Sequence, residues 1–198
     1  MIDQEDSKEK YKSNIEDYII ILDNIIPDDL CDRILLEYKN SDEWFLAPIA
    51  DYSTDAKLRD VHLIPISDPR RIARNEILRK TLDNQIFTCS ENASMKYSEL
   101  FPEVLFNGDT GYELLRYKVG QYYVQHTDSY SKHPRTVSCS FALNDDYEGG
   151  EFAFFDRKIK YKLKKGSAIL FPSNFMFPHE ILCVTKGTRY SIITWFTN

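Results

Sequence analysis

Two histidines and one aspartate in this sequence have the types and spacing that suit a catalytic metal ion. His126 and Asp128 are two residues apart, so on an extended backbone both side chains project from the same face and can reach one ion. We expect the third ligand to be His179, which precedes an apolar segment typical of a strand. Two neutral imidazoles and one carboxylate leave three metal positions open, which suits non-haem Fe(II) and oxygen chemistry. A structural zinc site would instead need four ligands, usually with cysteine among them.

A pattern as short as His-x-Asp is common by chance, so its context decides its meaning. Arg189 follows ten residues after His179, and on a strand it shares a face with Ser191, Ile193 and Trp195. This pattern places a guanidinium and a hydroxyl inside an otherwise apolar wall. Because an unpaired buried arginine is costly, an anionic group is expected beside Arg189. That group would be either an internal Asp or Glu, or a bound ligand.

The composition is that of a globular domain. The chain has 198 residues, of which 42% are hydrophobic and 28% charged, and a chain of this length can bury one core without staples. A net charge of -6 gives no broad basic surface, so nucleic-acid binding is disfavoured. The four cysteines lie far apart with no C-x-x-C pair, which favours reduced thiols over a zinc ribbon or a disulfide scaffold.

The first residues predict no targeting signal. Residues 1–18 are charged throughout and lack the basic-then-apolar pattern of a signal peptide. No apolar run approaches the ~20 residues needed to span a bilayer. We therefore expect a cytoplasmic protein without membrane association.

The elements that must position these residues begin with a supporting region. Residues 1–16 are polar and expected to be flexible, and residues 17–110 are expected to supply helices and strands. Tyr18–Leu22 is typical of a strand. A helix is predicted from Pro27 to about Asn40, because apolar residues recur there at helical spacing and acidic residues occupy its first turn.

The rest of this supporting region is mixed. Trp44–Asp60 has no clear period and is a candidate mobile loop, which could act as a substrate lid. Val61–Ile66 is typical of a strand, and a second helix is predicted from Pro69 to about Tyr97.

From Gly111 onward the sequence is typical of antiparallel strands. Short segments rich in Tyr, Val, Ile and Phe alternate with turn signals such as Glu148-Gly-Gly and Lys186-Gly. Residues 111–198 should form the catalytic β core, and residues 1–198 a single domain, since no repeat or linker divides them. Helices first and strands later indicate an α+β layout, in which the helices brace a β-sandwich or barrel.

The motifs around the expected ligands resemble those of the 2-oxoglutarate- and Fe(II)-dependent oxygenases. His-x-Asp, the later His and the Arg ten residues beyond it match that family's pattern. More narrowly, Tyr117–Asp128 is similar to the Y-x-x-G-x-x-Y-x-x-H-x-D stretch of the prolyl 4-hydroxylase-like branch. Arg135–Asn144 and Tyr147–Glu151 are similar to that branch's R-x-x-x…L-N…G-G-E segment. The resemblance is strong over residues 111–198 and extends to the N-terminal half only in outline.

The resemblance implies a double-stranded β-helix, or jelly-roll, core braced by the N-terminal helices. It implies Fe(II) on His126, Asp128 and His179, with 2-oxoglutarate as co-substrate, O2 as oxidant and ascorbate as a further cofactor. Arg189 would hold the 5-carboxylate of 2-oxoglutarate. The implied reaction hydroxylates a C–H bond and releases succinate and CO2.

Further co-substrate contacts follow from the same resemblance. Tyr117 matches a tyrosine that helps to bind 2-oxoglutarate and Tyr123 matches a second one that lines the site, although both could equally be core aromatics. Some relatives carry a Tyr where this chain has Ala142. One co-substrate hydrogen bond is therefore either missing here or supplied by Ser140 or Ser191.

The leading functional hypothesis is hydroxylation of a prolyl residue in a peptide or protein. The alternative is the same chemistry on a free amino acid or other small molecule, because fold and iron site do not dictate substrate and many prolyl 4-hydroxylases have Lys in place of Arg189. From other classes, a metal-dependent hydrolase would leave Arg189 unexplained, and an inactive binding module would keep the fold without turnover. Nucleic-acid demethylation is disfavoured, because that branch usually carries a second Arg shortly after the first and Tyr190–Phe196 has none.

Overall fold

The computed structural model describes residues 12–49, 53–68 and 75–198. Its supporting region contains a 3-10 helix, two α-helices and four short strands. In chain order these are the 3-10 helix Ile15–Tyr18, β1 (Ile20–Leu22), α1 (Asp28–Tyr38), β2 (Phe45–Leu46), β3 (Arg59–Asp60), β4 (His62–Pro65) and α2 (Glu76–Leu100).

The C-terminal half consists of strands joined by turns. They are β5 (Gly108–Asp109), β6 (Glu113–Lys118), β7 (Tyr122–His126), β8 (Val137–Ala142), β9 (Glu148–Gly149), β10 (Phe152–Phe154), β11 (Ile159–Tyr161), β12 (Ala168–Pro172), β13 (His179–Ile181), β14 (Val184–Lys186) and β15 (Thr188–Thr197).

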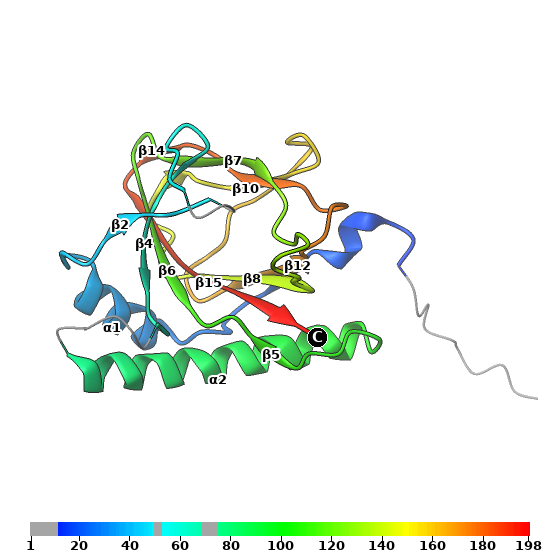
Figure 1. The fold of residues 1–198 in the computed structure, drawn as a ribbon, viewed down its shortest axis with the longest axis horizontal. Helices are drawn as coiled ribbons and strands as arrows, with labels where there is room; N and C mark the ends of the chain where they lie inside the picture. The colour runs from blue at the N-terminus through cyan, green and yellow to red at the C-terminus, as the bar shows by residue number, and fades with distance from the viewer. Residues whose placement is uncertain (1–11, 50–52, 69–74) are drawn as a thin grey trace, which may run out of the picture.

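Two antiparallel sheets face each other in a jelly roll. The larger sheet has eight strands in the order β1-β12-β8-β15-β6-β4-β2, with β5 pairing β15 off this path. The smaller sheet has the order β11-β10-β13-β7-β3, and β9 pairs with β14 in a separate ribbon. Figure 1 shows the larger sheet between the smaller sheet and the helices, with α2 running along its outer side. The predicted α+β jelly roll braced by N-terminal helices is confirmed.

The helices are held by apolar side chains that they turn toward the larger sheet. On α2, Leu82, Ile86, Ala93 and Tyr97 recur at helical spacing and are buried. They belong to one cluster with Ile192 of β15. Because burying one such aliphatic side chain contributes roughly 1.5–3 kcal/mol, this cluster fixes the sheet that carries much of the site.

A second apolar cluster fills the space between the sheets. It includes Leu115 of β6, Phe152 and Phe154 of β10, Phe171 of β12 and Ile181 of β13. These residues point inward because side chains alternate between the two faces of a strand. Two of the predicted metal ligands, His126 of β7 and His179 of β13, therefore lie against a rigid aromatic layer.

The second helix begins later than predicted. It starts at Glu76, after Asn75, whose side-chain oxygen accepts a hydrogen bond from the Leu78 N–H at 3.0 Å. Asparagine is a favoured N-cap because it supplies this missing partner. The predicted segment from Pro69 to residue 74 lies outside the described residues.

The stretch Trp44–Asp60 is not one loop, contrary to the prediction. Its first part contains β2 and its end is β3, while residues 50–52 lie outside the described residues. Strands of two residues are too short to show an alternating pattern, and tertiary pairing alone defines them. A role as a substrate lid stays a prediction.

The predicted flexible segment 1–16 overlaps the 3-10 helix at Ile15 and Glu16, and its flexibility stays a prediction. Residues 1–11 lie outside the described residues. Among the described residues, neither α1 nor α2 combines the length and apolar character that a membrane-crossing helix needs.

Candidate metal and co-substrate site

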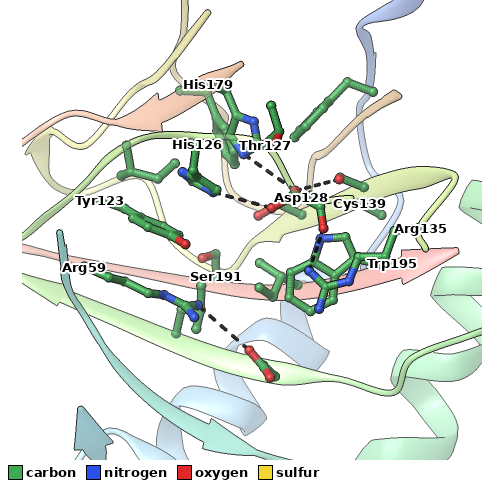
Figure 2. Close-up of a pocket in the computed structure, with 18 of the residues that line it drawn as sticks. Arg59, Tyr123, His126, Thr127, Asp128, Arg135, Cys139, His179, Ser191 and Trp195 are labelled. Atoms are coloured by element: carbon green, nitrogen blue, oxygen red, sulfur yellow. Dashed lines mark hydrogen bonds and ion pairs between the residues drawn. The ribbon is translucent and has the colours of Figure 1, made fainter. Parts of the chain in front are cut away.

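The pairing of β7 with β13 brings the two predicted histidine ligands together. His126, the last residue of β7, lies directly opposite His179, the first residue of β13, and their ring centroids are 4.4 Å apart. Asp128 lies two residues beyond the end of β7 rather than on it. Its Oδ1 is 3.4 Å from Nε2 of His126 and its Oδ2 is 3.6 Å from Nε2 of His179. Figure 2 shows the three side chains converging on one point.

This spacing fits one ion. The three ligand atoms lie within 4.8 Å of one another. Donor atoms bonded to one ion at about 2.1 Å and at right angles would be separated by about 3 Å, so only a small closure is needed. Two histidines and one carboxylate on one side of the ion leave the opposite side open to other ligands.

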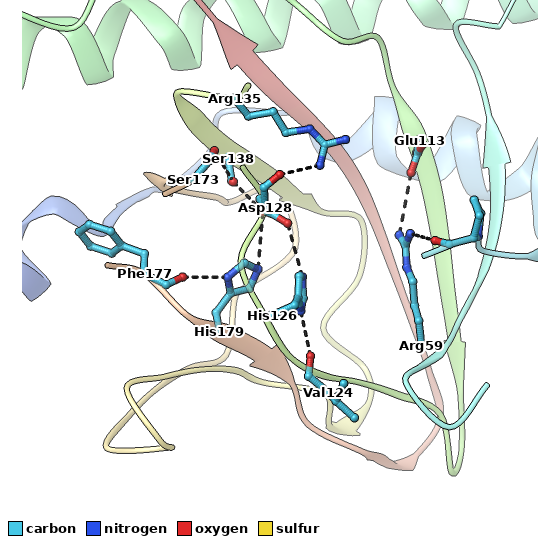
Figure 3. Close-up of polar contacts among 11 residues, drawn as sticks. Arg59, Glu113, Val124, His126, Asp128, Arg135, Ser138, Ser173, Phe177 and His179 are labelled. Atoms are coloured by element: carbon cyan, nitrogen blue, oxygen red, sulfur yellow. Dashed lines mark hydrogen bonds and ion pairs between the residues drawn. The ribbon is translucent and has the colours of Figure 1, made fainter. Parts of the chain in front are cut away.

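Each imidazole is oriented by a carbonyl on its other nitrogen. Nδ1 of His126 is 2.8 Å from the carbonyl oxygen of Val124, and Nδ1 of His179 is 3.2 Å from that of Phe177 (Figure 3). A carbonyl can only accept a hydrogen bond, so each ring must carry a proton on Nδ1 to make this contact. Nε2 of each ring then presents its lone pair to the shared point.

Asp128 is held by two serines. The hydroxyl of Ser138 on β8 donates to Oδ2 of Asp128 at 2.6 Å, and Ser138 and Ser173 hydroxyls are 2.8 Å apart. The backbone N–H of Asp128 donates to the carbonyl of Ser173. These contacts fix the carboxylate, which Figure 3 shows between Ser138 and the two imidazoles.

The protonation states suit metal binding. Burial, reinforced by the neighbouring His126, lowers the pKa of His179 to about 4, so its ring is neutral at pH 7. Burial by itself would raise the pKa of Asp128. The imidazoles and the Ser138 hydroxyl outweigh burial, and the pKa lies below its usual value. The site therefore offers neutral nitrogen and ionised oxygen donors.

Arg189 lines the same cavity. Because it is buried, it is expected to have an anionic partner. Its side chain is 3% exposed, and its Nη1 donates to Oγ of Ser191 at 2.8 Å. The guanidinium lies 5.1 Å from the ring centre of Tyr117 and 5.3 Å from that of Phe152. Among the described residues no carboxylate forms an ion pair with Arg189. Of the two predicted partners, a bound anion rather than an internal Asp or Glu fits this arrangement.

Both predicted tyrosines line the cavity. Tyr117 is fully buried and pairs in register with Arg189. Tyr123 stacks on His126 with ring centres 3.6 Å apart, and burial raises its pKa to about 12. The two tyrosines therefore lie beside different parts of the cavity, and contact of Tyr117 with a co-substrate stays a prediction.

The serines proposed to replace a missing co-substrate contact also lie here. Ser140 lines the cavity, and its hydroxyl is buried without a hydrogen-bond partner among the described residues. Ser191 lines it too but already contacts Arg189. Ala142 is buried and does not line the cavity.

Three charged residues of the cavity, Arg59, Glu113 and Arg135, were not assigned roles from the sequence. Arg135 stacks over Trp195 at 3.5 Å from its ring centre and donates to the carbonyl of Asp128 at 3.1 Å. Arg59 of β3 and Glu113 of β6 face each other across the cavity wall, with Nη2 and Oε2 4.0 Å apart. The position of Glu113 could have been predicted from the sequence, because it shares a strand face with the cavity residues Leu115 and Tyr117. Arg59 had none, since its place depends on the pairing of β3 with β7.

Comparisons with known proteins agree with this site. Residues 112–197 match the 2OG-Fe(II) oxygenase superfamily. Human prolyl 3-hydroxylase 2 is 41% identical over 68 residues, which cover 32% of this chain and 10% of that protein. A PKHD-type hydroxylase from a Synechococcus species is 33% identical over 89 residues, which cover 40% of this chain and 39% of that protein. The chain therefore matches well under two thirds of the length of these relatives.

Solved structures share the fold at low sequence identity. A prolyl hydroxylase of Trichoplax adhaerens, in complex with a hypoxia inducible factor peptide, has a TM-score of 0.76 and 18% identity, covering 90% of this chain and 83% of that one. A viral collagen prolyl hydroxylase from Paramecium Bursaria Chlorella virus-1 has a TM-score of 0.67 and 19% identity, covering 90% and 95%. The residues that match the 2OG-Fe(II) oxygenase superfamily thus include the His-Asp-His cluster, and the solved structures share the jelly-roll fold of this chain.

Proposed function

We propose that this protein is an Fe(II)- and 2-oxoglutarate-dependent dioxygenase that hydroxylates an unactivated C–H bond and releases succinate and CO2. The observation that carries this proposal is one cavity holding His126, Asp128 and His179 beside Arg189, a buried cation with no acidic partner among the described residues. A metal-dependent hydrolase would use His126, Asp128 and His179 as ligands, but it would not explain the buried Arg189.

The residues have distinct roles in this proposal. His126, Asp128 and His179 would hold Fe(II), which with 2-oxoglutarate and O2 supplies the oxidising chemistry when bound. Arg189 would bind the 5-carboxylate of 2-oxoglutarate, because its planar guanidinium matches a carboxylate with two hydrogen bonds. Ser191 orients that guanidinium from one side.

The chain also controls access and orientation. Tyr117 forms part of the buried wall beside Arg189, and Tyr123 stacks on the His126 ring and limits its rotation. Phe152 and Phe171 close the apolar side of the cavity. Excluding water strengthens charge interactions inside the site and protects reactive species from side reactions.

A prolyl residue of a peptide or protein is the substrate that we propose. Support comes from the relatives, which are named prolyl 3-hydroxylases and PKHD-type hydroxylases, and from the fold shared with prolyl hydroxylases. Ascorbate as a reductant and a cytoplasmic location stay predictions.

Turnover with each component omitted in turn tests this function. Purified protein with Fe(II), 2-oxoglutarate, O2 and a proline-containing peptide library should form succinate and add one oxygen atom to a peptide, as seen by mass spectrometry. His126→Ala and Asp128→Ala should each abolish succinate formation, because each removes one of three ligands. Peptide hydrolysis that continues without O2 and 2-oxoglutarate would assign the site to hydrolytic chemistry instead.

A further inference from the structure

The cavity has two chemically different ends along β15. Alternate residues of this strand face the cavity, from Arg189 at one end to Ile193 and Trp195 at the other. The neighbouring strand β6 pairs Tyr117 with Arg189 and Glu113 with Ile193. Glu113 therefore lies at the end away from the proposed 2-oxoglutarate anchor.

The Glu113 side chain is 32% exposed, but one of its two carboxylate oxygens is buried without a hydrogen-bond partner among the described residues. Its Oε2 is buried without a hydrogen bond among the described residues, and Nη2 of Arg59, at 4.0 Å, is too far to donate one. Burial raises the pKa of Glu113, although Arg59 and Arg135 oppose that rise. Buried polar atoms are normally paired, so an orphaned oxygen in a cavity wall indicates a missing partner.

The two arginines beside Glu113 are also incompletely paired. Arg59 donates to the carbonyl of Pro48 at 2.6 Å, and Arg135 stacks on Trp195, yet the Nε of each arginine is buried without an acceptor among the described residues. Figure 2 shows Arg59 and Arg135 on opposite sides of the cavity, and Figure 3 shows Arg59 directed at Glu113. This end of the cavity is thus lined by one carboxylate and two guanidinium groups, each with an atom that has no hydrogen-bond partner among the described residues.

We propose that Glu113 is a specificity residue, which accepts a hydrogen bond from an N–H group of the substrate while the neighbouring guanidinium groups bind an adjacent carbonyl or carboxylate. This deepens, and rests on, the proposed oxygenase function. The recognised chemistry is an N–H donor close to an acceptor oxygen. A peptide bond next to the reacting residue supplies it, and so does a free amino acid.

A purely structural ion pair between Glu113 and Arg59 makes a different prediction. Breaking such a pair would lower stability without changing which substrates are preferred. Substrate discrimination therefore separates the two roles, and it is measured independently of the melting temperature.

The test uses pairs of probes in which one member lacks the N–H donor. Blocked proline-containing peptides are paired with copies N-methylated at the amide next to the prolyl residue, and free L-proline is paired with N-acetylproline. The wild-type protein should prefer the N–H member of at least one pair by about 10- to 100-fold in kcat/KM, the effect expected for a hydrogen bond to a charged group. Which pair shows the preference distinguishes a peptide from a free amino acid.

Variants at Glu113 should remove that preference. Glu113→Met, apolar and of similar length, should reduce the ratio to about one while the KM for 2-oxoglutarate stays unchanged. Glu113→Gln keeps the shape and should lower the ratio as well, because a neutral acceptor binds N–H more weakly than a carboxylate. If the Glu113→Met variant fails to fold, the Glu113→Gln variant is compared with the wild type instead. Glu91→Met, at an exposed position of α2, is the matched control.

Equal discrimination by the wild type and the Glu113 variants would overturn the assignment. So would a wild-type protein that consumes O2 and 2-oxoglutarate but neither binds any probe, by perturbation of the Fe(II)–2-oxoglutarate absorption band, nor favours an N–H member. Failure of the oxygenase proposal itself would give a different result, because the protein would then consume no 2-oxoglutarate under any condition.

Discussion

At the scale of single residues, the site depends on side chains whose charge states are set by burial and by the groups around them. His179 is kept neutral by burial, Asp128 is kept ionised by the groups around it, and Arg189 donates a hydrogen bond to the hydroxyl of Ser191. Each state is costly without a ligand and favourable with one. The site is therefore preorganised for a cation next to a dianion.

Arg189→Ala should raise the 2-oxoglutarate concentration needed for half-maximal succinate formation by about 100-fold, because truncating one partner of a buried charge pair typically costs about 2–5 kcal/mol. The affinity for Fe(II), measured separately, should change little. Arg33→Ala on the exposed side of α1 serves as control. An unchanged dependence on 2-oxoglutarate in the Arg189 variant would show that the anchor is assigned to the wrong residue.

Ser138→Ala should weaken Fe(II) binding by about tenfold, because residues that orient a ligand carboxylate commonly contribute about 10- to 100-fold to metal affinity. Isothermal titration with Fe(II) under anaerobic conditions measures this loss. Ser140→Ala is matched to it, since Ser140 lies on the same strand and lines the same cavity without contacting Asp128. If both variants bound Fe(II) equally well, the Ser138 hydrogen bond would have no role in holding the ligand.

Glu113 should make stability depend on pH. Because its pKa is raised in the folded protein, the native state holds this proton more tightly than the unfolded chain, and stability is lost as pH rises above about 4.3, the unfolded value. Glu113→Gln cannot titrate, so its stability relative to the wild type should increase over that range. Urea unfolding at several pH values checks the sign. A relative stability that falls with pH would mean that the carboxylate is stabilised in the fold.

The convergence of the proposed metal ligands and of Arg189 on one cavity could be predicted from residue types and spacing, whereas the rest of the cavity could not. His126, Asp128, His179 and Arg189 form a pattern that one sequence displays. Arg59 enters the cavity only because a two-residue strand pairs with β7, a tertiary event without a local signal.

At the scale of elements, strand pairing sets the geometry of the site. β7 and β13 carry the histidines at opposite positions, and β8 brings Ser138 beneath the aspartate. Long strands and helices with clear periods were predictable, since tertiary context only had to agree with them. The start of α2 was placed too early, because an apolar pattern does not reveal which residue caps a helix.

In the two-stranded ribbon of β9 and β14, the strands lie so close together that an added side-chain atom should lower stability. Gly149 has a positive φ of 72°, and a Cβ there would overlap the carbonyl oxygen of Cys183. Gly149→Ala should therefore lower the free energy of unfolding by about 1–3 kcal/mol, as expected for strained backbone. Gly108→Ala in β5, where an added Cβ meets nothing within 4 Å, should change it by less than about 0.5 kcal/mol. Equal losses would show that the ribbon tolerates a side chain.

At the scale of the whole molecule, an acidic protein encloses a cavity with a surplus of arginines. The net charge is -6, yet Arg59, Arg135 and Arg189 line the cavity against the carboxylates of Asp128 and Glu113. Charge of one sign inside a low-dielectric cleft attracts ligands of the other sign. The overall charge predicted the lack of a broad basic surface but could not reveal this local reversal, which arises only when distant strands meet.

The central claim is that three side chains hold Fe(II) where 2-oxoglutarate can chelate it beside Arg189. An anaerobic titration with Fe(II) and then 2-oxoglutarate, followed by visible absorption, tests this directly. The wild type should develop a charge-transfer band that saturates at one equivalent of each component, and Asp128→Ala should develop none. A band of equal intensity in that variant, or no band in a folded wild-type protein, would contradict the account.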